Sequence, residues 1–123
     1  MSPRTYLLAR FQADAEALRQ RAAVLRSGPA LPGPDSATSS QMADACDHVV
    51  AMVTAVAAHD DASIEIASLL GLVPLLEQRA STSAVPTVRA VFVGAATRIR
   101  EVRDAELRIA QAPIDDEGEE EDS

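Results

Sequence analysis

Apolar residues recur at alternating spacings of three and four along most of the chain. This heptad pattern is typical of helices that pack against other helices, as in bundles and coiled coils. The first series comprises Leu8, Phe11, Ala15, Leu18, Ala22 and Leu25. Similar series are Met42, Cys46, Val49, Val53 and Val56, and then Phe92, Ala95, Ile99 and Val102. No run of alternating apolar and polar residues is long enough to demand a strand, so the pattern predicts an all-α protein.

Glycines, prolines and capping residues set the expected limits of the first two helices. The first helix is predicted over residues 3–26, and the segment 27–34, with two glycines and three prolines, forms a loop. Asp35 and the hydroxyl residues after it supply N-caps for a second helix that we expect to reach residue 58. A turn at residues 59–61 explains the shift in the apolar series, and one continuous helix with a register shift is the alternative.

The second half of the chain is divided by prolines. A further apolar series, Ile66, Leu69 or Leu70, Val73 and Leu76, contains Gly71 and Pro74. Pro74 predicts a kink there, or two short helices with Pro74 opening the second. A fourth helix is expected from Pro86 to residue 112, where Pro113 ends it. The fold predicted for residues 1–112 is therefore an antiparallel bundle, most simply of four helices. Residues 113–123 hold seven acids and no base, which predicts a disordered acidic tail.

Charge is segregated along the predicted helices. Formal side-chain charges sum to +3 over residues 1–26, −6 over 27–84, +2 over 85–112 and −7 over 113–123, which gives the net −8 of the chain. Basic outer helices beside an acidic middle suit neighbours within one bundle, and they suit a multi-chain assembly equally well.

The apolar positions predict a weakly stabilised core. The chain has 24 alanines and three aromatic residues, and alanine favours helix while burying little area. Small bundles of this kind often complete their core with a partner. We therefore expect a non-enzymatic interaction module (an adaptor, assembly subunit or chaperone) that binds another helical protein or its own copy. The candidate interface residues are Leu8, Phe11, Leu18, Leu25, Phe92 and Ile99.

A metal-dependent hydrolase is the alternative. Asp44 with Asp47, and Glu101 with Asp104, have the i, i+3 spacing that places two carboxylates on one helix face, where they could hold Mg²⁺ or Mn²⁺. The second pair resembles the E-x-x-D pair of helical nucleotide pyrophosphohydrolases of the MazG type, whereas the first pair is D-x-x-D. The resemblance would imply that these four carboxylates hold the metal ion of a hydrolase that acts on a nucleotide-like substrate.

Other chemistry finds little support in the sequence. No phosphate-binding glycine loop or histidine metal motif is present, so no cofactor is expected. Cys46 lies on an apolar series and is interpreted as a small buried residue. The arginines of residues 85–112 could contact nucleic acid, but acids are interleaved with them, so we predict no such partner. No apolar run is long enough to span a bilayer, and we expect a cytoplasmic protein.

Overall fold

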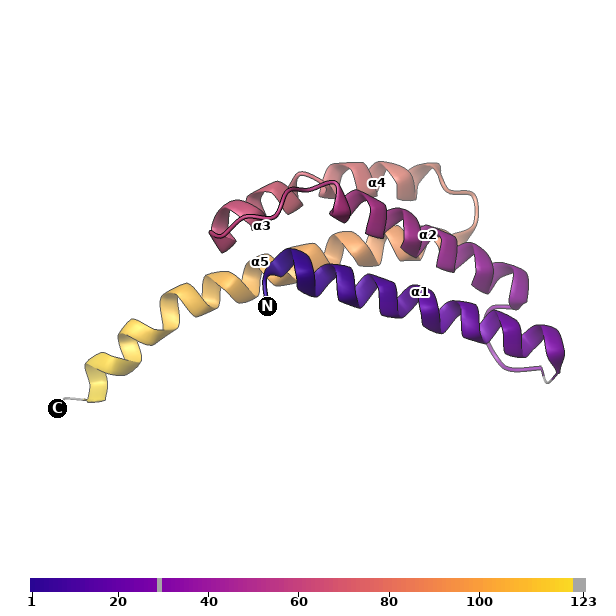
Figure 1. The fold of residues 1–123 in the computed structure, drawn as a ribbon, viewed down its shortest axis with the longest axis horizontal. Helices are drawn as coiled ribbons and strands as arrows, with labels where there is room; N and C mark the ends of the chain where they lie inside the picture. The colour runs from indigo at the N-terminus through magenta and orange to yellow at the C-terminus, as the bar shows by residue number, and fades with distance from the viewer. Residues whose placement is uncertain (29, 121–123) are drawn as a thin grey trace.

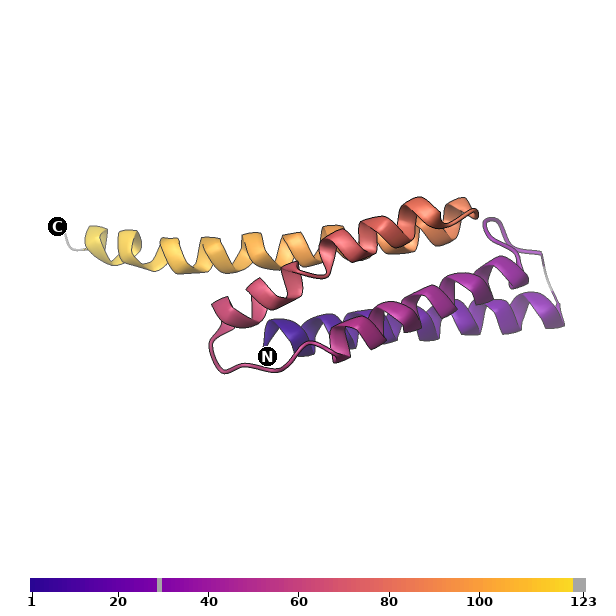
Figure 2. The same ribbon diagram turned by 90° about the horizontal axis from the view of Figure 1, so that it is seen from above.

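The computed structural model describes residues 1–28 and 30–120, with side chains as far as Ile109. The helices are α1 (Pro3–Ser27), α2 (Ser36–Thr54), α3 (Ala62–Leu70), α4 (Val73–Thr82) and α5 (Pro86–Glu120). The described residues contain no strand, so the all-α prediction is confirmed. Two antiparallel hairpins, α1 with α2 and α4 with α5, meet mainly along α2 and α5 (Figures 1 and 2).

The turn between α1 and α2 is anchored by one arginine of α1. The Arg21 guanidinium donates hydrogen bonds to the carbonyl oxygens of Pro32, at 2.6 Å, and Pro34, at 3.0 Å. Gly33 between them has a φ of +102°, a left-handed conformation that favours glycine. A Cβ at this position would also come within 3.2 Å of the Arg21 guanidinium. Asp35 then caps the N-terminus of α2.

Two short helices, α3 and α4, follow α2 and together take the place of one longer helix in the bundle. α2 ends at Thr54, before the predicted residue 58, and Asp61 caps α3 by accepting a hydrogen bond from the Ser63 N–H at 2.9 Å. The predicted separation of the second and third helices is thus confirmed. α3 ends at Gly71, and Pro74 occupies the first turn of α4, where its missing N–H has no helical partner to lose.

The last helix is longer than the sequence predicted. Its expected end at Ala112 is wrong, because the helical backbone of α5 continues through Pro113 to Glu120. An internal proline removes one hydrogen bond from the helix, and the other backbone bonds of α5 span that position. The C-terminal part of α5 projects beyond the other helices (Figure 1). Of the predicted disordered tail, residues 113–120 thus have a helical backbone, and residues 121–123 lie outside the described residues.

The core uses most of the predicted apolar positions, with one change in α1. Leu7 is fully buried there, whereas the predicted Leu8 is half-buried at the edge of the core. The main cluster joins all five helices through Leu7, Phe11, Ala45, Val49, Val53, Leu69, Val73, Leu76, Ala80, Phe92, Ala95, Ala96 and Ile99. Ala15, Ala22 and Ala43 are buried as well. Alanines on both α1 and α2 let these two helices approach closely.

One buried carboxylate joins three elements at the end of the bundle where α1 begins. Glu65 of α3 is only 1% exposed. Its two oxygens accept hydrogen bonds from the backbone N–H groups of Arg4, at 2.8 Å, and His59, at 2.9 Å. The first of these donors belongs to the first turn of α1, where the positive end of the helix dipole favours an anion. Glu65 therefore caps α1 from a different helix.

The side chain of Arg4 caps the C-terminus of α2. Its guanidinium donates to the carbonyl oxygen of Val56 at 2.6 Å and to that of Thr54 at 3.0 Å. Carbonyl groups at a helix C-terminus lack helical partners, and a cation there is favoured by the dipole. Arg4 and Glu65 together fasten the start of α1, the end of α2 and α3.

Glu65 remains ionised in spite of its burial. Burial by itself raises the pKa of this carboxyl, because the charged form loses its water. The N–H groups of Arg4 and His59, the Ser2 hydroxyl and the positive charge of Arg4 act in the opposite direction. Their combined effect is larger, so the pKa of Glu65 lies below its ordinary value.

We predict that Glu65→Gln destabilises the fold by about 2–4 kcal/mol, because the amide cannot accept hydrogen bonds at both of its polar ends. The measurement is urea unfolding at pH 7, followed by circular dichroism. Glu101→Gln is the matched control, since Glu101 is exposed, and its effect should stay within about 0.5 kcal/mol. Equal losses in the two variants would contradict the capping role of Glu65.

Glu65 also predicts a pH dependence. A carboxyl whose pKa is lower in the folded than in the unfolded chain stabilises the fold above the unfolded pKa, about 4.3 for glutamate. That contribution is lost as the pH falls through the folded pKa. The difference in unfolding free energy between wild type and Glu65→Gln should thus be largest above pH 5 and shrink towards pH 3. A difference that stays constant over this range would show that the charge of Glu65 contributes nothing.

Candidate functional site

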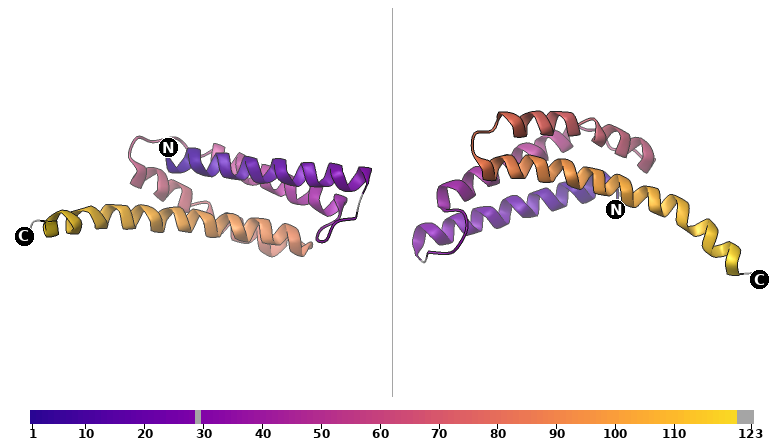
Figure 3. Two further views of the ribbon diagram at one scale, coloured as in Figure 1. Left: turned by 90° about the horizontal axis from the view of Figure 1, so that it is seen from below. Right: turned by 180° about the vertical axis from the view of Figure 1, so that it is seen from behind.

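α1 and α5 run antiparallel on opposite sides of a groove. α1 packs closely on α2, and α5 packs on α2 and α4, but α1 and α5 approach each other at few points. Their ribbons run apart from one another along the bundle (Figure 3). Two hollows lie between them, and Arg98 of α5 borders both. We call the two hollows together the α1–α5 groove.

The narrower hollow of the groove is apolar and has a volume of about 380 Å³. Its floor includes residues of the core, and small residues form much of its sides. The lining residues are Phe11, Asp14, Ala17, Leu18, Met42, Cys46, Val49, Ala90, Val91, Gly94, Ala95 and Arg98. A Cβ added to Gly94 would meet no atom within 4 Å, so this side of α5 opens onto free space.

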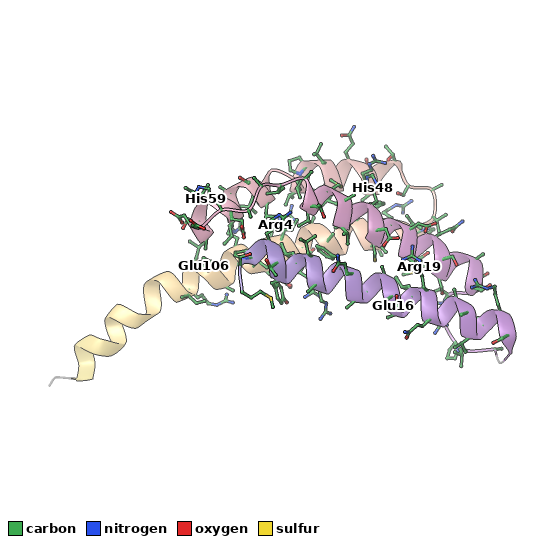
Figure 4. All side chains as sticks on the ribbon, in the orientation of Figure 1. Arg4, Glu16, Arg19, His48, His59 and Glu106 are labelled. Atoms are coloured by element: carbon green, nitrogen blue, oxygen red, sulfur yellow. The ribbon has the colours of Figure 1, made fainter. Side chains whose placement is uncertain are left out.

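The wider hollow of the groove, about 610 Å³, combines exposed apolar side chains with acidic ones. Met1, Ser2, Pro3 and Tyr6 line it from the start of α1, and His59, Asp60 and Ala62 from the α2–α3 connection and the start of α3. α5 contributes Arg98, Glu101, Val102, Ala105, Glu106 and Ile109. Figure 4 shows His59 and Glu106 at this end of the molecule, near Arg4. The Arg4–Glu65 network thus fixes the backbone that carries the hollow.

The groove follows from a second apolar series on α5 that lies beside the predicted one. Phe92, Ala95 and Ile99 face the core, as their heptad spacing predicted. Val91, Gly94, Arg98, Val102, Ala105 and Ile109 follow spacings of three and four and line the groove. Apart from Val102, heptad spacing in the sequence did not reveal this series, because a glycine, an alanine and an arginine interrupt it. Counting small residues as apolar would have shown that the apolar face of α5 is wider than its core contact.

Cys46 forms part of the floor of the groove and is a free thiol, 5% exposed. Burial is the largest effect on its pKa, and the negative charges of Asp14 and Asp47 add to it. Together they raise the pKa of Cys46 to about 11, although the positive charge of Arg19 acts in the opposite direction. The thiol is accordingly protonated and unreactive at neutral pH.

The four candidate metal ligands lie in different surroundings. Asp44 and Asp47 both form ion pairs with Arg19 of α1, the first at 3.3 Å. Glu101 borders the groove, and Asp104 accepts a hydrogen bond from Arg103 at 3.0 Å. Among the described residues, no three His, Cys, Asp or Glu side chains are grouped so that they could hold a metal ion. The predicted convergence of these two acid pairs is not seen in that part of the chain.

The six candidate interface residues divide into two groups. Phe11, Phe92 and Ile99 are buried in the core of the single chain, at 4%, 6% and 1% exposure, so a partner cannot cover them fully from outside. Leu8, Leu18 and Leu25 are half-buried. Leu18 and Phe11 line the narrower hollow of the groove.

Most arginines of the predicted basic face of α5 have partners within the chain. Arg89 donates to the carbonyl oxygen of Ser83 at 2.9 Å, and Arg100 pairs with Glu77 of α4. These bonds fasten α5 to α4 and occupy charges that nucleic acid would need.

A third hollow, of about 550 Å³, lies between α2 and α4. His48 and Met52 line it from α2, and Leu75, Gln78, Arg79 and Thr82 from α4. His48 packs edge-on against Phe92 of the core, with ring centroids 6.1 Å apart. Fewer apolar side chains line this hollow than line the α1–α5 groove.

Comparison with known proteins finds no match to this chain among family models, curated proteins or solved structures. Within the described residues, no helix combines the length and the apolar composition needed to cross a membrane.

We predict that Cys46 in the folded protein reacts with iodoacetamide at pH 8 about 100-fold more slowly than in the urea-unfolded chain, because burial suppresses the thiolate. Cys46 is the single cysteine, so intact-mass spectrometry gives its rate directly. A folded-state rate close to the unfolded one would mean that the groove floor is open to solvent at Cys46.

Proposed function

We propose that this protein is a non-enzymatic binding module that holds a helix of a partner protein in the α1–α5 groove. The observation that carries the proposal is a pair of hollows between two helices of the same chain, with apolar side chains along much of their lining. The groove follows α5 from Ala90 to Ile109, which at 1.5 Å per residue is about 28 Å, or five helical turns. Grooves of this kind take the apolar face of an amphipathic helix.

The small residues along the groove support a helix as the occupant. Ala17 of α1 and Ala90 and Gly94 of α5 are all exposed and border the narrower hollow. Small side chains let a third helix come near both backbones, and the half-buried Leu18 and Val91 offer it apolar contacts. A helix seated there would add a third neighbour to α1 and α5 and complete the bundle.

Exposed apolar side chains at the wider hollow also support a partner. Tyr6 is 42% exposed there and Ile109 is 63% exposed.

The proposal covers an adaptor, an assembly subunit or a chaperone, since each would use the same groove. A cytoplasmic setting belongs to the proposal and is supported by the free, buried Cys46, which is typical of reducing compartments.

Gly94 provides the test, because it borders the groove and its missing side chain leaves open space. Gly94→Ala should stabilise the fold by about 0.5–1 kcal/mol through helix propensity and leave the groove open. Gly94→Leu should also fold, but its side chain would fill the narrower hollow. We predict that a partner recovered from cells of the source organism by wild type and by Gly94→Ala is lost with Gly94→Leu.

The comparison uses quantitative mass spectrometry of proteins that co-purify with each variant, after circular dichroism has established that both are folded. Both variants change the same residue, so a difference between their co-purifying proteins reports the effect of filling the groove with a larger side chain. Identical sets of co-purifying proteins for Gly94→Ala and Gly94→Leu would overturn the proposed function.

A further inference from the structure

We infer that the occupant of the α1–α5 groove is a basic amphipathic helix, with an apolar face flanked by arginine or lysine. The inference rests on the proposed function and identifies the chemistry of the partner. It comes from the charges that surround the wider hollow, which are acidic and lack ion-pair partners among the described residues.

Three carboxylates border the wider hollow. Asp60 belongs to the connection between α2 and α3, and Glu101 and Glu106 belong to α5. Arg98 is the one lysine or arginine side chain in its lining, so the lining side chains carry a formal charge of −2 with histidine neutral, and the α-amino group of Met1 brings the sum to −1. None of these four side chains forms an ion pair with another residue in the described part of the chain.

The other carboxylates whose side chains the structure describes each have an ion-pair or hydrogen-bond partner. Asp14, at the narrower hollow, lies 3.7 Å from Arg10, and Arg100 pairs with Glu77 on the opposite side of α5. Three carboxylates left unpaired beside an apolar hollow therefore stand out from the rest of the surface. Cations on the edges of a seated helix would pair with them while its apolar face covers Tyr6 and Val102.

The residues that follow the groove along the chain add to the negative charge near the wider hollow. α5 runs on from Ile109 towards residues 113–123, which hold seven acids and no base. A basic helix approaching this end of the groove is attracted by both sets of charges, which raises its rate of association at low salt.

The same charges argue against a second copy of this chain as the occupant. A two-fold dimer through the groove would place the same surface on both sides of the contact. Both copies would then bring the carboxylates of the groove lining into one contact, in a protein that already carries a net charge of −8. Like charges across a contact suppress association.

The experiment uses three synthetic helical peptides of equal length that share one leucine–alanine face and differ only in their flanking residues, which are lysine, glutamine or glutamate. Binding to the full chain is followed by fluorescence anisotropy at low and high salt. We expect the lysine peptide to bind about 10-fold more tightly than the glutamate peptide at low ionic strength, and the preference to shrink to about 3-fold or less in 0.5 M NaCl.

Variants of groove residues test whether the preference for the lysine peptide arises in the groove. The double variant Glu101→Gln/Glu106→Gln should remove most of the preference for the lysine peptide over the glutamate peptide. Asp104→Asn is the matched control, because Asp104 is an exposed acid on the same helix outside the groove lining, and it should keep the preference. Gly94→Leu should weaken binding of all three peptides.

The outcomes separate the two proposals. If all three peptides bind equally and Gly94→Leu abolishes their binding, the groove is a helix site and the inference of a basic partner is overturned. If none binds, both proposals fail. Sedimentation of the chain alone gives the remaining outcome: a dimer that Gly94→Leu dissociates would make a second copy the occupant, which overturns the inference and keeps the proposed function.

Discussion

The geometry of this protein depends on the hydrogen bonds that Glu65 and Arg4 exchange with helix ends. Glu65 of α3 caps the N-terminus of α1, and Arg4 of α1 caps the C-terminus of α2. Each group satisfies backbone atoms at a helix end, so removing either leaves those atoms without a partner in the chain. The network fixes where α1 starts relative to the α2–α3 connection, and these two segments form one side of the wider hollow of the groove.

The groove itself arises from an unequal distribution of apolar volume. α1 and α2 approach closely because alanines lie between them, and α5 buries Phe92 and Ile99 towards α2 and α4. α1 and α5 are thus both held by α2 rather than by each other. The space between them keeps an apolar floor, and the small residues on α1 and α5 leave it open. An unfilled position in the bundle is therefore a consequence of how this sequence packs.

Much of the fold could be predicted from the sequence, because the signals are local. Heptad spacing placed Val49, Phe92 and Ile99 in the core, and a glycine and a proline indicated the break between α3 and α4. The Arg4–Glu65 network could not be predicted, since it joins residues far apart in the chain and a buried glutamate has no periodic signature. The groove was missed for a related reason: Gly94 and Arg98 interrupt its apolar series, and only the packed structure shows that α1 does not cover it.

The most direct test of the groove as a helix-binding site is isotope-filtered nuclear magnetic resonance. Methyl-labelled protein would be mixed with the unlabelled lysine-flanked peptide, and contacts between peptide leucines and protein methyl groups would be assigned. A helix in the groove should contact Leu18, Val91 and Val102, which line it, and should not contact Leu75 in the hollow between α2 and α4. Contacts to Leu75 without contacts to Val91 and Val102 would contradict helix binding in the groove.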